Sequence, residues 1–137
     1  MRFRLMNIAI IADIEKAFLQ IQLNPIDRDV TRFLWLKDIS NLSIDNNLCV
    51  YRFCRVPFGI ICSPFLLNAT LRYYLKELNT VNSNKILKNM YVDNIIIEAN
   101  DVSNALEIYW EAKETFQKIR MNLREWTSNS IIFNTGI

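Results

Sequence analysis

One apolar run, residues 6–12, limits most strongly how this chain can fold. Its sequence, MNIAIIA, is rich in β-branched side chains and shows no strict alternation of polar and apolar positions. Such a run is typical of a strand in the middle of a sheet, buried on both faces. The run ends abruptly at Asp13. We therefore expect a central strand that ends in a carboxylate.

The rest of the chain has patterns for two hairpins and two long helices. Ser63-Pro64 is a favourable helix start, with Ser as the N-cap and Pro in the first turn. Asp93-Asn94 lies between two β-rich runs, which is typical of a tight hairpin turn. The expected elements are a short helix over 14–23, hairpin strands over 31–36 and 48–56, a helix over 63–78, a loop over 79–84, strands over 88–92 and 95–98, a long helix capped by Asp101 and a strand over 122–126.

The order of these elements predicts the fold class. With the hairpin between residues 13 and 63 set aside as an insertion, the order is strand, helix, strand, strand, helix, strand. This is the split βαβ plan of an α+β fold, ferredoxin-like (βαββαβ), here with a β-hairpin inserted after the first strand. A length of 137 residues fits a single domain. In such a sheet Asp13 and Asp93 are expected to meet, although 80 residues separate them.

The amino-acid composition excludes some catalytic groups and metal ligands, and it indicates a cellular compartment. The chain has no histidine, which excludes an imidazole base and a histidine-bound metal. Three cysteines without a C-x-x-C pair favour free thiols in a reducing, intracellular compartment, with cytoplasm and nucleus both open. The longest apolar stretch, 56–67, is too short to span a membrane, and residues 1–4 lack the apolar part of a signal peptide. A net charge of +2 neither indicates nor excludes a nucleic-acid partner.

Two carboxylates at neighbouring strand ends could hold Mg²⁺. This ion prefers hard oxygen ligands and takes one or two carboxylates together with substrate phosphates. A pair of such ions can activate an attacking oxygen and stabilise a leaving one in phosphoryl transfer. The alternative is purely structural. Asp13 would then cap a short helix, and Asp93-Asn94 would only form a turn.

Four segments of the sequence resemble motifs of one enzyme family. They are IADIEKAFLQI at 11–21, YRFCRVPFG at 51–59 with SPFLLNAT at 63–70, YVDN at 91–94, and LREWTSN at 123–129. In this order and spacing they resemble the motifs of reverse transcriptases, in particular those of BEL/Pao-type LTR retrotransposons. The resemblance covers nearly the whole chain and implies the palm domain of an RNA-directed DNA polymerase.

The resemblance also implies roles for individual residues. Asp13 and Asp93 would bind two Mg²⁺ ions, for which Mn²⁺ can substitute, with the backbone carbonyl of Ile14 as a further ligand. Asn94 would take the third catalytic position, and four residues would lie near the nucleotide or template: Phe18, Phe58, Gly59 and Tyr91. The structural alternatives are a core Phe, an ordinary turn glycine and a strand tyrosine without a role. The partners implied are an RNA or DNA template with its primer, deoxynucleoside triphosphates and the remainder of a pol polyprotein.

The chain departs from the family pattern in three respects. The second aspartate of the tyrosine–x–Asp–Asp motif is Asn94, which brings no charge, so we expect weaker metal binding and severely reduced turnover. Glu125 lies where related elements often carry a basic residue. The fingers, thumb and RNase H regions are absent from 1–137, so we expect a palm fragment.

Two other functions stay open. One is a catalytically dead retroelement relic that at most binds nucleic acid or protein weakly. The other is another palm-type nucleotidyltransferase, such as a nucleotide cyclase. These enzymes also have two carboxylates on a ferredoxin-like sheet but lack the Pro-Phe-Gly, Ser-Pro and Tyr-Val-Asp segments.

Overall fold

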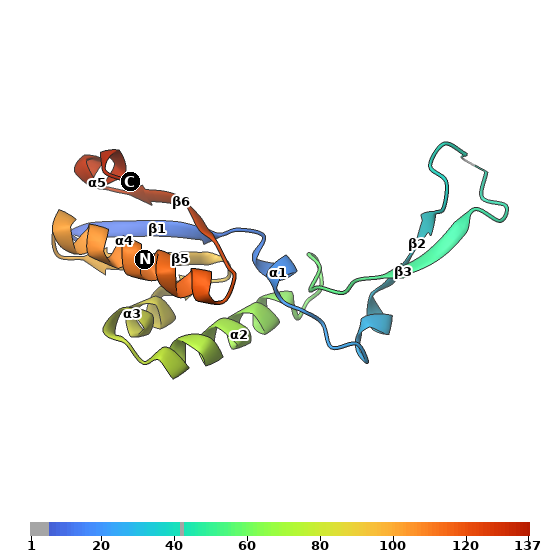
Figure 1. The fold of residues 1–137 in the computed structure, drawn as a ribbon, viewed down its shortest axis with the longest axis horizontal. Coiled ribbons are helices and arrows are strands. Elements are labelled where there is room, and N and C mark those ends of the chain that lie inside the picture. Colours follow the sequence, from blue (N-terminus) through green and yellow to red (C-terminus); the bar gives the residue numbers. More distant parts are fainter. Residues whose placement is uncertain (1–5, 42) are drawn as a thin grey trace.

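The computed structural model describes residues 6–41 and 43–137, and its centre is a four-stranded sheet (Figure 1). The strands are β1 (Ile8–Ile14), β4 (Met90–Tyr91), β5 (Asn94–Ala99) and β6 (Leu123–Ser128), in the spatial order β4-β5-β1-β6. All neighbours pair antiparallel. The apolar run is therefore a central strand, as predicted, with Ala9 and Ile10 on opposite faces and both fully buried.

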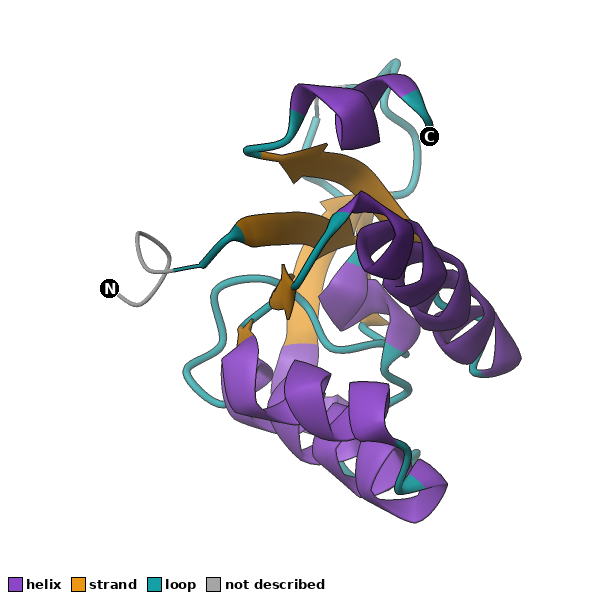
Figure 2. Ribbon diagram, turned by 90° about the vertical axis from the view of Figure 1, so that its left-hand side faces the viewer, coloured by secondary structure: helices purple, strands orange, loops and turns teal. Residues whose placement is uncertain are grey.

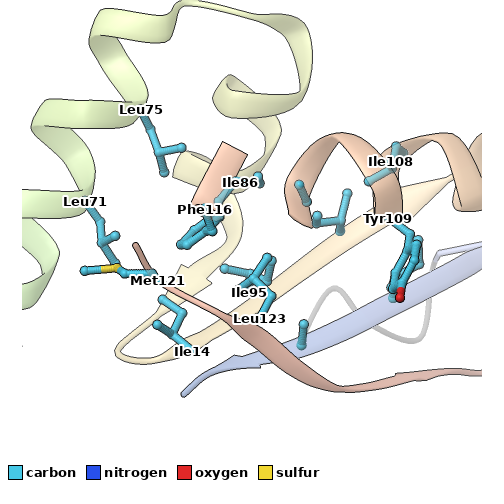
Figure 3. Close-up of a cluster of buried hydrophobic side chains, with 14 of the residues drawn as sticks. Ile14, Leu71, Leu75, Ile86, Ile95, Ile108, Tyr109, Phe116, Met121 and Leu123 are labelled. Atoms are coloured by element: carbon cyan, nitrogen blue, oxygen red, sulfur yellow. The ribbon is translucent and has the colours of Figure 1, made fainter. Parts of the chain in front are cut away.

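Three helices complete the α+β architecture around one hydrophobic core. They are α2 (Ser63–Leu78), α3 (Val81–Asn89) and α4 (Val102–Lys118). Their apolar side chains converge on those of the sheet, with Phe116 among the largest fully buried groups (Figure 3). Taken with the chain order, the strand order is that of a ferredoxin-like βαββαβ fold. The predicted fold class is confirmed.

The inserted hairpin forms a sheet of its own. Strands β2 (Arg32–Leu36) and β3 (Leu48–Arg52) pair with each other and project away from the main sheet (Figure 1). The predicted strand over 48–56 ends early because the chain turns back, and the Val56 amide donates to the Ile21 carbonyl at 3.0 Å. The short helix predicted over 14–23 shrinks to α1 (Ala17–Gln20). Its start is delayed because β1 continues through Ile14 and Lys16 has a φ of 50°.

The segment between α2 and β5 differs from the prediction. The expected loop over 79–84 and strand over 88–92 are largely replaced by α3, and β4 has only two residues. The cause is a capping box at Thr80 and Ser83: each side chain accepts from the other residue's backbone amide. This pairing satisfies the first amides of α3 and starts a helix where the polar composition indicated a loop.

Three further details concern the helix ends. Helix α2 has the predicted bounds, but Cys62 is its N-cap and the Ser63 hydroxyl instead donates to the Pro57 carbonyl at 2.7 Å. Asp101 caps α4 as predicted, accepting from the Asn104 amide. Helix α5 (Ile131–Thr135), which the sequence pattern did not predict, packs against β6 beside the C-terminus (Figure 2).

Among the described residues, no helix has both the length and the apolar composition to cross a membrane. The expectation about a signal peptide falls on residues 1–4, which lie outside the described residues.

Replacing Thr80 with alanine should lower the free energy of unfolding by about 1 kcal/mol, because the first turn of α3 loses its cap. Thr70→Ala is the matched control. Thr70 lies inside α2, where its hydroxyl bonds the Leu66 carbonyl at 2.9 Å and alanine is a better helix former. Urea denaturation of both variants measures the difference. Equal losses would contradict the capping role.

Candidate two-carboxylate site

The end of β1 and the β4–β5 hairpin bring the two predicted aspartates together. Asp13 is the cross-strand partner of Asn94, and the Ile14 amide donates to the Asp93 carbonyl at 2.8 Å. Asp93 precedes β5 directly, so both carboxylates lie at the same end of two adjacent, antiparallel strands. The juxtaposition expected from the fold order is therefore present.

The turn that carries Asp93 is tight and strained. Tyr91 pairs with Asn94, so the two turn residues are Val92 and Asp93, one position earlier than the predicted Asp93-Asn94. The prediction was wrong because Asn94 is already the first residue of β5. Val92 has a φ of 53°, which a β-branched residue rarely adopts. A strained backbone conformation persists only where the surrounding structure holds the residue in place, and such conformations are frequent at functional sites.

Asn94 interacts directly with its neighbouring carboxylate. Its side-chain Nδ2 donates to Asp93 Oδ1 at 3.1 Å. The side-chain amide of Asn94 therefore stabilises one carboxylate oxygen of Asp93 by a hydrogen bond and adds no negative charge of its own. A cation at this position would meet two carboxylates where the family motif offers three.

A residue of β6 to which the sequence motifs assigned no role also contacts Asp13. Arg124, on β6, is the cross-strand partner of Asp13, and its Nε donates to Asp13 Oδ2 at 3.2 Å. This hydrogen bond raises the pKa of Arg124 above its usual value. The final strand was predicted, but a register irregularity between β1 and β6 decides which of its side chains faces Asp13, and no residue type marks that irregularity.

Glu15 lies just beyond the end of β1 and ties it to the start of β6. Its amide donates to the Asn122 carbonyl at 2.9 Å, and the Asn122 side chain donates to Glu15 Oε2 at 3.0 Å. This side-chain hydrogen bond lowers the pKa of Glu15. The contact fixes the strand ends between which Asp13 and Arg124 lie.

Of the four residues expected near a nucleotide, the structure brings Phe18 and Phe58 into direct contact. Phe18 is 4% exposed and Phe58 is 71% exposed, and their rings meet edge to face with centroids 4.7 Å apart. Phe18 is thus part of the core, and its ring packs against the exposed ring of Phe58. Gly59 follows Phe58 with a φ of +85°, and Tyr91 is 74% exposed.

Gly59→Ala should lower the free energy of unfolding by about 1–2 kcal/mol, because a φ of +85° is unfavourable for a residue with a Cβ. The Cβ would meet no atom within 4 Å, so the loss would come from the backbone conformation and not from a clash. Gly136→Ala is the control. Gly136 has a φ of −99°, and its Cβ would make ordinary contacts of 3.5 Å or more, so we expect a change near zero. Thermal unfolding compares the two. Similar effects would show that the Gly59 conformation is not what requires glycine.

The sequence model of one protein family matches residues 4–127, and its description is reverse transcriptase (RNA-dependent DNA polymerase). The chain belongs to the reverse transcriptase family. No curated protein matches the chain. The matched region includes the inserted hairpin and both aspartates, so the family assignment and the two-carboxylate geometry refer to the same part of the chain. The BEL/Pao subtype stays a prediction.

The donor set at the ends of β1 and the β4–β5 hairpin fits a hard divalent cation. Asp13 and Asp93 supply carboxylate oxygens from adjacent strand ends, and Mg²⁺ is bound by one or two carboxylates with water and substrate phosphates completing its shell. Within 6–41 and 43–137, no three His, Cys, Asp or Glu side chains cluster as a metal site. The fit therefore rests on two carboxylates plus backbone or amide oxygens.

Proposed function

We propose that this chain is the palm segment of an RNA-directed DNA polymerase from a BEL/Pao-type retrotransposon pol polyprotein. Its reaction would add deoxynucleotides to a primer 3′-hydroxyl on an RNA or DNA template, with release of pyrophosphate. One observation carries the proposal: Asp13 on β1 is the cross-strand partner of Asn94 on β5, and Asp93 lies in the turn directly before Asn94. Membership in the reverse transcriptase family supports it.

In this proposal Asp13, Asp93 and the Ile14 carbonyl hold two Mg²⁺ ions, with Mn²⁺ as a substitute. When bound, the ions would supply the activation of the primer oxygen and the stabilisation of the leaving pyrophosphate. The strained turn at Val92 holds Asp93 against the end of β1. Phe18, supported by Phe58, would limit the space beside the sugar of the incoming nucleotide.

Asn94 and Arg124 favour a second candidate function, a binding module without catalysis. The amide of Asn94 removes one negative charge from the family motif, and the guanidinium of Arg124 pairs with Asp13. Both features weaken a dication site, and neither prevents the exposed aromatic residues from contacting nucleic acid.

Primer extension on an RNA template, in Mg²⁺ and in Mn²⁺, tests the proposed function. We expect weak incorporation by the chain, more product from Asn94→Asp, and none from Asp93→Asn. If Asn94→Asp gives no more product than Asp93→Asn, the assignment of the site fails. Salt-sensitive binding of template without any incorporation would instead support the binding module.

A further inference from the structure

We propose that Arg124 is an internal counter-ion that occupies the cation position on Asp13 and must leave it before a divalent ion binds. The inference rests on the proposed function, since it concerns the same carboxylate. It assigns to Arg124 a contact that competes with metal binding at Asp13.

The position of Arg124 results from a β-bulge. Between the pairs Ile11↔Thr127 and Asp13↔Arg124, β6 contains one more residue than β1. The irregularity coincides with Glu125, whose φ is 53°. A regular ladder continuing from Ile11↔Thr127 would make Glu125 the partner of Asp13 and would place two carboxylates face to face. The bulge instead places a cation there.

The contact with Asp13 is a charge-assisted hydrogen bond at the edge of the solvent. The Asp13 side chain is 22% exposed and that of Arg124 is 46% exposed, and Nε lies 3.2 Å from Oδ2. A dication bound to the same carboxylate would lie beside a fixed positive charge. Because like charges repel, metal binding and the Arg124 contact oppose each other.

Arg124 has a second acidic partner within reach. Its Nη2 lies 3.6 Å from Glu125 Oε1, and the Glu125 side chain is 70% exposed. The guanidinium can therefore move from Asp13 toward Glu125 without losing a counter-charge. This geometry makes the contact reversible rather than a fixed part of the core.

Arg124→Gln is expected to lower the stability of the metal-free chain and to raise its affinity for Mn²⁺. Without metal, the variant loses the ion pair between Arg124 and Asp13, so it should unfold at a lower temperature in chelator. With Mn²⁺, the variant should bind the ion about two- to fivefold more tightly, the scale of a solvent-exposed ion pair. A purely structural salt bridge would lower stability and leave Mn²⁺ affinity unchanged or weaker.

The experiment is Mn²⁺ titration of the full chain by electron paramagnetic resonance, with thermal unfolding in chelator and in Mn²⁺. Lys118→Gln is the matched control, because it removes an exposed ion pair, Lys118 Nζ to Glu114 Oε1 at 2.9 Å, on α4 outside the site. It should leave Mn²⁺ affinity unchanged. Arg124→Lys keeps the positive charge and should not tighten binding as Arg124→Gln does.

Unchanged or weaker Mn²⁺ binding by Arg124→Gln would overturn the inference, as would equal tightening by Arg124→Lys. Asp13→Asn separates this failure from failure of the proposed function. If Asp13→Asn weakens Mn²⁺ binding and Arg124→Gln does not tighten it, the cation site stands and only the counter-ion role falls. If Asp13→Asn leaves Mn²⁺ binding unchanged, the two-carboxylate site itself is wrong and the inference falls with it.

Discussion

Asn94→Asp should increase the affinity of the chain for Mn²⁺ at least about tenfold. The substitution adds a negative charge beside Asp93 and opposite Asp13. Tenfold corresponds to about 1.4 kcal/mol, well below the ~4 kcal/mol that two unit charges about 4 Å apart gain at an effective dielectric of about 20. Titration with Mn²⁺ followed by electron paramagnetic resonance measures the change.

Asn100→Asp is the matched control for this prediction. It adds the same charge just beyond Ala99, at the other end of β5, where the neighbouring carboxylate is Asp101 and the strand pairing does not reach Asp13. Its Mn²⁺ affinity should stay within about twofold of the unsubstituted chain, since charges a strand length apart are screened. Equal tightening by both variants would mean that net charge, and not a site at Asp93, sets the affinity.

Phe116→Ala should lower the free energy of unfolding by about 3–5 kcal/mol. Phe116 lies on α4, is fully buried, and points into the core between the helices and the sheet (Figure 3). The loss combines transfer of the ring to water with the cavity left behind, and it is a large share of the 5–15 kcal/mol typical of a folded domain.

Phe65→Ala on α2 is the control, because that ring is 70% exposed and its removal should change stability by less than about 0.5 kcal/mol. Chemical denaturation followed by circular dichroism compares the two variants. A loss below 1 kcal/mol for Phe116→Ala would mean that α4 does not pack on the sheet as described.

The elements that could be predicted are those whose signal is local and periodic. The apolar run before Asp13, the Asp101 cap of α4 and the Ser-Pro pair of α2 each predicted an element that the structure contains, although the N-cap of α2 is Cys62. Helix α3 was missed because it has few apolar residues and its capping box uses Ser83 at the third helical position, where Glu or Gln is the usual signal. Buried Ser83 and Ile86 anchor it through tertiary packing, which the local pattern does not reveal.

The site was only partly predictable, because some of its contacts depend on features that no local sequence pattern marks. The meeting of Asp13 with Asp93 followed from the order of strands, because that order makes β1 and β5 neighbours. The exact turn and the contact with Arg124 depend on positive φ angles at Val92 and Glu125. Glycine or asparagine normally marks such positions, and neither residue type is present there. The register of β6 therefore had to be observed.

The most direct test of the account is a crystal structure of the chain soaked in Mn²⁺, with the ion located by its anomalous scattering. If Asp13 and Asp93 share a cation site, an anomalous peak will lie within coordination distance of both carboxylates, at the end of β1 and beside the β4–β5 turn. A well-ordered site without such a peak, or a peak bound to other residues only, would contradict it.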